Sequence, residues 1–308
     1  MRELHPDCQA FLEEVARLNI PASTVEEIRA RYRRLCRHFA GPRAEGVETS
    51  EIEAPVRARL YATSPAAPLL VWLHGGRMIS GDLETHDAVC RLLASRSGWR
   101  VLIVDYRLAP EHPFPAAVED ASAALAFARA MSPAVAIGGD SAGASLALAA
   151  ALTAPQSAAA LVLIYPMIDA TCHLPSHAEF RAGPGTSSED IRLGYTLWLP
   201  PGADARDPRI SPLFSPSFAG LPPTFLLTAG IDPLRDEGVR LAARLIECEV
   251  PLTHTHYPRH LHGFFTYPAR FTAAGEAVAH AAAFLSLRSR GGEREQGAYW
   301  RLRHERAE

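Results

Sequence analysis

Residues 139–143 read Gly-Asp-Ser-Ala-Gly, a GxSxG pentapeptide with a serine at its centre. The apolar residues 134–137 before it predict a buried strand, and the alanine-rich residues 144–152 after it predict a helix. A strand, a sharp turn and a helix in this order expose the central serine, and the flanking glycines leave room where strand and helix cross. The helix N-terminus would also bring N–H groups and positive potential to Ser141. Because a GxSxG pattern also arises by chance, its surroundings must decide whether this serine is a nucleophile.

A carboxyl group and an imidazole follow the serine in the order that this chemistry needs. Asp232 comes after the apolar residues 224–228, and His262 comes after the strand-like residues 252–256. If these strands run parallel to the strand before the serine, all three side chains lie at the same edge of the sheet. Serine, aspartate and histidine in this chain order are typical of α/β hydrolases. Asp236 is the rival acid, and its alternative role is a charge in the first turn of a helix.

Backbone N–H groups for an oxyanion hole are expected in a second turn. His74-Gly75-Gly76-Arg77 follows the buried, apolar residues 69–73. The amides of Gly75, Gly76 and Arg77, together with that of Ala142, are the candidate donors to the oxyanion of a tetrahedral intermediate. A plain Gly-Gly turn is the alternative.

The rest of the chain alternates between strand-like and helix-like segments, which predicts an α/β fold with a mostly parallel sheet covered by helices on both faces. Two amphipathic helices separated by Pro21 are expected within residues 11–40. Residues 170–223 are rich in Gly, Pro and Ser around a helical piece at 191–199, which indicates an insertion above the carboxyl edge of the sheet. The expected strands are 52–61, 69–73, 101–105, 134–138, 160–164, 224–228 and 252–256, and the expected helices are 85–97, 115–131, one from about 142, 234–247 and 272–287.

Composition narrows the function classes. The 308 residues are 48% apolar and 21% charged, with a net charge of −3 and a pI near 6.5, which excludes the basic surface of a nucleic-acid binder. All 31 basic residues are arginines. The absence of lysine excludes Schiff-base catalysis, a Ser-Lys dyad and a phosphate-binding P-loop.

Targeting, redox and metal signals are weak. The five scattered cysteines form no CxxC pair, and residues 1–10 lack the apolar run of a signal peptide. Residues 142–168 have the length of a membrane span but are broken at Pro155, so no stable membrane insertion is expected. His254 and His256 alternate along a strand without acidic or cysteine ligands at a typical spacing, so no metal is expected. These features together predict a soluble, cytoplasmic protein.

Six segments together resemble the bacterial hormone-sensitive-lipase family of carboxylesterases, and the likeness extends over almost the whole chain. They are HGG at 74–76, DYRLAPEHPFPAA at 105–117, GDSAG at 139–143, SPL at 211–213, DPLRDEG at 232–238 and HGF at 262–264. The resemblance implies an α/β-hydrolase fold, a mostly parallel central sheet flanked by helices with a helical cap. It implies Ser141 as the nucleophile, His262 as the general base and Asp232 as its orienting carboxylate. No cofactor is expected.

The resemblance also implies a domain organisation. Residues 1–45 would form an N-terminal helical segment of the cap, and residues 46–290 the catalytic domain with a cap insertion at about 170–210. Residues 291–308 are expected to be a polar C-terminal tail.

The expected activity is hydrolysis of short- to medium-chain carboxylic esters, small molecules, through an acyl-enzyme. One open alternative is an amidase, a lactone hydrolase or an acyltransferase on the same triad. Another is a non-catalytic small-ligand receptor on the same fold, although such proteins typically lack a triad member. Homodimers through an edge strand or the cap are common among similar proteins, and a homodimer stays open here.

This sequence departs from the family at position 77, where the usual third glycine of HGGG is arginine. The N–H of Arg77 survives the change, but a side chain adds strain if the position requires a positive φ. A guanidinium beside the nucleophile could also narrow the pocket or bind an acidic group of the substrate. We therefore hypothesise that Arg77 alters substrate preference.

Overall fold

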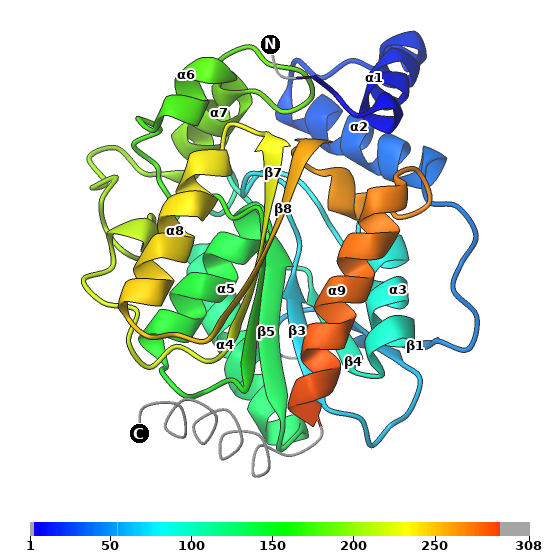
Figure 1. Cartoon of the computed structure of the whole chain (residues 1–308), viewed down its shortest axis with the longest axis vertical. Helices are drawn as coiled ribbons and strands as arrows, with labels where there is room; N and C mark the ends of the chain where they lie inside the picture. The colour runs from blue at the N-terminus through cyan, green and yellow to red at the C-terminus, as the bar shows by residue number, and fades with distance from the viewer. Residues whose placement is uncertain (1–2, 54, 290–308) are drawn as a thin grey trace, which may run out of the picture.

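The computed structural model describes residues 3–53 and 55–289, which form an eight-stranded sheet between two layers of helices (Figure 1). The strand order is β1-β2-β4-β3-β5-β6-β7-β8, with β3 to β8 parallel and β1 and β2 antiparallel at one edge. The strands are β1 (Glu48–Ile52), β2 (Ala58–Ala62), β3 (Leu69–Leu73), β4 (Arg100–Val104), β5 (Val135–Asp140), β6 (Ala160–Ile164), β7 (Thr224–Ile231) and β8 (Leu252–Leu261).

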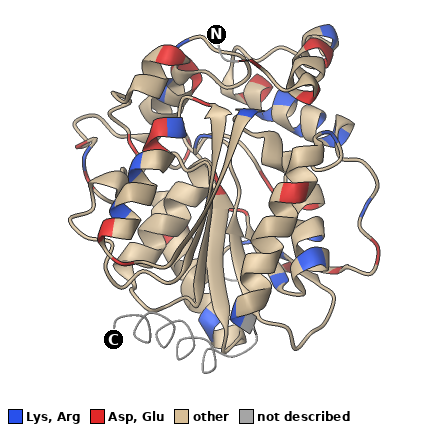
Figure 2. Cartoon of the chain, in the orientation of Figure 1, with Lys and Arg blue, Asp and Glu red and all other residues tan. Residues whose placement is uncertain are grey.

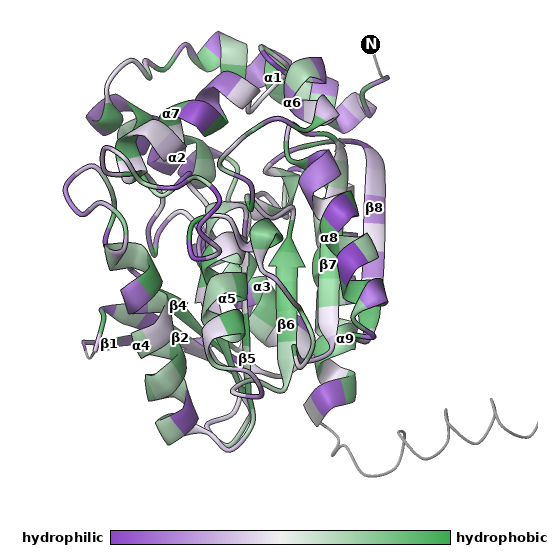
Figure 3. Cartoon of the chain, turned by 90° about the vertical axis from the view of Figure 1, so that its left-hand side faces the viewer, coloured by the Kyte–Doolittle hydropathy of each residue, from purple (hydrophilic) through white to green (hydrophobic). Residues whose placement is uncertain are grey.

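Two hydrophobic cores lie on the two faces of this sheet. Along β3, Leu69, Val71 and Leu73 pack into the core on one face, while Leu70 and Trp72 pack into the core on the other. Successive side chains of a strand point to opposite faces, so a strand covered on both sides must be apolar throughout. Figure 3 shows this hydrophobic character along β6, whereas the edge strand β8 is more polar.

The helices divide between the two faces. One core includes α4 (Ala116–Met131), α5 (Ala142–Thr153) and α8 (Arg235–Glu247), and the other includes α3 (Asp87–Ser97) and α9 (Thr272–Ser289). Figure 2 shows that charged residues lie mostly on the outer helices and loops, while the central strands carry few. The predicted α/β class, with a mostly parallel sheet flanked by helices, is confirmed.

One predicted strand is wrong. The sequence predicts a single strand over residues 52–61, but β1 ends at Ile52 and β2 begins at Ala58, and the two pair antiparallel as a hairpin. Apolar and polar residues alternate through this connection as they would in a strand. Pro55 lies in it, where its missing N–H and fixed φ suit a turn better than a ladder.

Four further helices lie together above the carboxyl ends of the parallel strands (Figure 1). The N-terminal pair is α1 (Pro6–Leu18) and α2 (Val25–His38), and the pair from the inserted segment is α6 (Pro175–Glu179) and α7 (Ser188–Trp198). Helices α2 and α7 each begin with a capping box, made by Thr24 with Glu27 and by Ser187 with Asp190.

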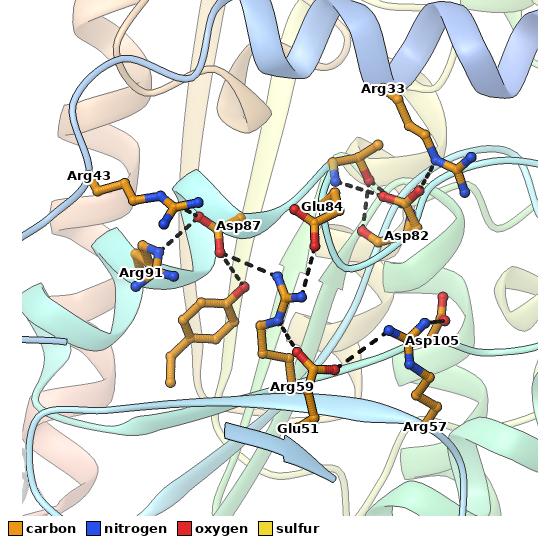
Figure 4. A network of polar contacts seen from close by, with 12 residues as sticks. Arg33, Arg43, Glu51, Arg57, Arg59, Asp82, Glu84, Asp87, Arg91 and Asp105 are labelled. Atoms are coloured by element: carbon orange, nitrogen blue, oxygen red, sulfur yellow. Dashed lines mark hydrogen bonds and ion pairs between the residues drawn. The ribbon is translucent and has the colours of Figure 1, made fainter. Parts of the chain in front are cut away.

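A network of ion pairs joins α2, the β1–β2 hairpin and α3 (Figure 4). Arg59 on β2 pairs with Glu84 at 2.8 Å and with Asp87 at 3.6 Å, and Asp87 pairs with Arg91 at 2.8 Å. Arg33 on α2 pairs with Asp82, which lies in the loop after β3. The antiparallel edge and α2 are thus linked by charge to the loop that follows β3.

Candidate active site

Ser141 occupies the sharp turn between β5 and α5. Its backbone has φ 54° and ψ −117°, a strained combination for a residue with a side chain. A Cβ atom on Gly139 or Gly143 would lie 2.3 Å or 1.9 Å from the carbonyl oxygen of Leu73 on the neighbouring strand. The two glycines therefore allow strand β3, strand β5 and helix α5 to approach closely enough to form the turn.

The structure brings the serine, the histidine and the aspartate together. Ser141 Oγ lies 3.0 Å from His262 Nε2, and His262 Nδ1 lies 2.8 Å from Asp232 Oδ2. Asp232 directly follows β7 and His262 directly follows β8, so both sit at the carboxyl edge of the sheet. Because a carboxylate can only accept, Nδ1 carries the proton shared with Asp232, and Nε2 is left to accept from Ser141.

Asp232 is fully buried and held in place by a second bond. Its Oδ1 accepts the N–H of Leu234 at 2.7 Å. The rival acid, Asp236, lies elsewhere: its carboxylate accepts the N–H of Ser176 and pairs with Arg235, both at 2.8 Å. Asp232, and not Asp236, is therefore the carboxylate in contact with His262.

The loop after β3 supplies backbone N–H groups beside Ser141. Gly76 has φ 135° and Arg77 has φ 59°. Among the described residues, no hydrogen bond uses the N–H of Gly76, Arg77 or Ala142, so these three donors are available to an oxyanion. The N–H of Gly75, also a predicted donor, instead donates to Asp140 Oδ1 at 3.1 Å.

Buried polar groups hold this loop from behind. Asp140 is paired with His86 at 3.0 Å. Burial by itself would raise the pKa of Asp140, but His86 and the Gly75 N–H hold it below its ordinary value. Burial lowers the pKa of His74 to about 4, so this ring is neutral where it stacks on Tyr106, whose hydroxyl donates to the His74 carbonyl at 2.7 Å.

Sequence reasoning missed two side chains at this site. Tyr165 follows β6 with φ 35°, and its ring centre lies 4.5 Å from that of His262. Asp140 occupies the variable position of the GxSxG motif. An acidic residue at the end of an apolar strand was the sequence signal that could have pointed to it, because a buried carboxylate needs polar partners. Tyr165 gave no such signal, because an aromatic residue after an apolar strand is ordinary core material.

A cavity of about 410 Å³ opens onto Ser141 and His262. The two N-terminal helices and the segment after β8 give it mainly apolar walls. Members of these walls include Phe11, Val15, Ile28, Leu35, Phe264 and Tyr267. The arrangement can hold an apolar group next to a serine hydroxyl that contacts an imidazole.

Residues 3–53 and 55–289 contain no group of three or more His, Cys, Asp or Glu side chains that could hold a metal ion. His254 and His256 both lie 2.9 Å from the hydroxyl of Thr228. Within the same ranges, no helix combines the length and the apolar character needed to span a bilayer. The predicted tail, 291–308, lies outside the described residues.

The known sequences that this chain resembles include ester hydrolases. A family described by its alpha/beta hydrolase fold matches residues 70–266. The carboxylic ester hydrolase LipN of Mycobacterium tuberculosis is 38% identical over 260 residues, covering 77% of this chain and 69% of that protein. The ethyl acetate hydrolase of Pseudomonas putida is 32% identical over 305 residues, covering 89% and 96%.

Solved structures agree. An esterase of Pyrobaculum calidifontis superposes with a TM-score of 0.82 at 33% identity, covering 92% of this chain and 98% of that one. An esterase described as belonging to the bacterial hormone-sensitive lipase family superposes with a TM-score of 0.84 at 28% identity, covering 94% and 99%. The likeness thus extends through the sheet and the helices above it.

Proposed function

Since this chain belongs to the α/β-hydrolase family and is a carboxylic ester hydrolase of the bacterial hormone-sensitive-lipase type, we propose that it cleaves its substrates through an acyl-enzyme on Ser141. The observation that carries the proposal is the continuous set of hydrogen bonds from Ser141 through His262 to Asp232, at the wall of an apolar cavity.

The first half of the reaction acylates the serine. His262 Nε2 accepts the hydroxyl proton while Ser141 Oγ bonds to the ester carbonyl carbon. The N–H groups of Gly76, Arg77 and Ala142 donate to the resulting oxyanion. When the intermediate collapses, the carbon–oxygen bond to the alcohol breaks, and the leaving alkoxide takes the proton from His262.

The second half of the reaction hydrolyses the acyl-enzyme and regenerates the free enzyme. A water molecule gives a proton to His262 and adds to the acyl carbon, and collapse of this second intermediate releases the acid and restores the Ser141 hydroxyl. Asp232 keeps the imidazole in the productive tautomer throughout and stabilises its cation. The ring of Tyr165 faces the imidazole and favours the same cation.

The cavity supports a preference for short- to medium-chain acyl groups. Its volume, about 410 Å³, is at the lower end of the range for small-molecule pockets. We assign its covering walls to a cap made from residues 1–45 and about 170–210, which contain α1, α2, α6 and α7. Phe11 on α1 supports this assignment, because its ring packs against Tyr267 and Phe271 beside the site.

The remaining expectations stay predictions. They are a cytoplasmic location, a homodimer as an open alternative, and the absence of nucleic-acid binding and of membrane insertion.

A series of p-nitrophenyl esters with increasing acyl length tests the proposal, with Ser141→Ala as the control. We expect a maximum of kcat/KM at short to medium chains and loss of turnover in the variant to about background. A matching anilide separates esterase from amidase activity. Ligand binding without a burst or turnover would instead favour a non-catalytic receptor, and hydrolysis that survives Ser141→Ala would refute the nucleophile assignment.

A further inference from the structure

Two arginine side chains reach the cavity that contains Ser141 and His262. Arg77 comes from the loop after β3, and Arg31 comes from α2. The other cationic side chain of the lining is His262 when protonated, and most remaining walls are apolar. Charges in such surroundings act more strongly than on an exposed surface, because water screens them less.

The acidic side chains of the lining do not balance these two arginines. Asp140 is committed to His86 and to the N–H of Gly75. Asp190 pairs with Arg77 Nη1 at 3.1 Å through one oxygen, while its other oxygen accepts the N–H and the hydroxyl of Ser187. Among the described residues, the lining thus holds two guanidinium groups and one carboxylate, Asp190, that pairs with either of them.

Several guanidinium donors are left without an acceptor. Within the described part of the chain, Arg77 has no hydrogen-bond partner for its Nε or Nη2. Arg31 donates to the carbonyl of Ile20 at 2.6 Å and meets no carboxylate in the same part. Burial lowers the pKa of Arg77, and the charge of Arg31 acts in the same direction. A second anion in the cavity would offset both the cost of burying the Arg77 charge and its repulsion from Arg31.

The fold accommodates the Arg77 side chain at some cost. At φ 59° an L-residue is strained, and a glycine would be relaxed. Opposite it on α7, a Cβ on Gly194 would lie 2.7 Å from the Arg77 Cβ, so only glycine fits there. Asp190 and Gly194 are one helical turn apart and therefore lie on the same face of α7. On this face, Gly194 leaves room for the Arg77 side chain and Asp190 pairs with its guanidinium.

We propose that Arg77 and Arg31 together bind a carboxylate carried by the substrate, so that the preferred esters bear a second, ionised carboxyl group. This inference rests on the proposed function. The expected substrates are half-esters of dicarboxylic acids, or esters whose alcohol part carries the carboxylate. A guanidinium that meets a carboxylate between mainly apolar walls forms charge-assisted hydrogen bonds, which are stronger than neutral ones.

Two substrate pairs distinguish the positions of the carboxylate. Mono-p-nitrophenyl adipate and p-nitrophenyl hexanoate differ in a carboxylate or a methyl group at the end of the acyl chain. The hexanoate esters of 4-hydroxybenzoate and of its methyl ester differ on the alcohol side. The readout is the ratio of kcat/KM for the charged ester to kcat/KM for the neutral ester, compared between variants so that intrinsic reactivity cancels.

The variants predict opposite changes in this ratio. Arg31→Met and Arg77→Met each remove a positive charge, and we expect the ratio to fall by about 10- to 100-fold for one pair. Asp190→Asn removes the competing carboxylate while its oxygen can still accept in the capping box, so the ratio should rise. Arg34→Met, on the exposed side of α2, is the matched control and should leave the ratio unchanged.

A mere strut between the loop and α7 would behave differently. In that case Arg77→Met and Asp190→Asn would slow the hydrolysis of charged and neutral esters alike. An unchanged ratio in the two arginine variants would overturn the anion site. The proposed function would still stand if hydrolysis continued to depend on Ser141. If Ser141→Ala hydrolyses all four esters as fast as the parent enzyme, the proposed function fails, and this inference fails with it.

Discussion

Gly143→Ala tests whether close packing at the serine turn sets the geometry of the oxyanion hole. The new Cβ would lie 1.9 Å from the Leu73 carbonyl oxygen and 2.4 Å from its carbon, where an ordinary contact is about 3.4 Å or more. These atoms are backbone, so they cannot rotate away. The end of β3, or the start of α5, must therefore move by roughly 1 Å.

The consequence for catalysis follows from the chain connection. Leu73 is followed directly by His74, Gly75 and Gly76, so a displacement of β3 moves the proposed oxyanion donors relative to Ser141. A misplacement of about 1 Å costs about 100-fold in rate. Overpacking of this kind also lowers the free energy of unfolding by about 1–3 kcal/mol.

The assay combines kcat/KM on a short p-nitrophenyl ester with urea unfolding. Gly275→Ala, at the fourth residue of α9 with no atom within 4 Å of the new Cβ, is the matched control. It should raise the free energy of unfolding by about 0.5–1 kcal/mol and leave kcat/KM unchanged. A Gly143→Ala enzyme with the parent's activity and stability would refute the reasoning.

Three further predictions concern the acid that contacts His262, the aromatic ring beside it, and the buried histidines. Asp232→Asn should lower kcat by about 10⁴-fold because the tautomer of His262 is lost, while Asp236→Asn should change it by less than about tenfold, and equal losses would contradict the assignment. Tyr165→Leu should lower kcat by up to about tenfold and Tyr165→Phe should retain it, since the ring lies against the imidazole and, among the described residues, no hydrogen bond joins the hydroxyl to His262. The free energy of unfolding should fall between pH 6.5 and 4, because burial lowers the pKa of His74, His177 and His260 to about 4 from 6.5 and the unfolded chain takes up the protons. The raised pKa of Glu237 opposes this fall, so urea unfolding that shows no loss at pH 5 would mean that Glu237 prevails.

Much of the architecture could be predicted because the parallel strands have a simple pattern. Strands such as β3 and β6 are apolar at every position, which marks burial on both faces. The motif serine, the acid and the histidine each follow a strand of the parallel part of the sheet, so the sheet direction places them at one edge. The hairpin at 48–62 was harder, since its alternation runs through the connection.

The contacts within the site were less accessible to sequence reasoning. The N–H groups that remain available to an oxyanion depend on where the buried acceptors lie. The carboxylate of Asp140, for example, accepts a hydrogen bond from the N–H of Gly75. The pairing of Arg77 with Asp190 joins residues 113 positions apart, on elements whose docking no local pattern describes. Both facts come from packing between elements and not from the preferences of any one segment.

The choice of His262 over its neighbours shows how strand register decides the chemistry. From Thr224↔Leu252 to Ala229↔Tyr257, strands β7 and β8 pair with an offset of 28 residues, which would place His260 opposite Asp232. An irregularity after Ala229 shifts the pairing to Ile231↔Leu261, so the next residues to meet are Asp232 and His262.

Gly230 makes this shift possible, because a Cβ there would lie 2.0 Å from the carbonyl oxygen of Pro258. Pro258 itself donates no ladder hydrogen bond, which weakens the regular pairing at the same point. A glycine facing a proline across two strands thus moves the second strand by two residues. That displacement brings the imidazole of residue 262 within reach of both the carboxylate and the serine.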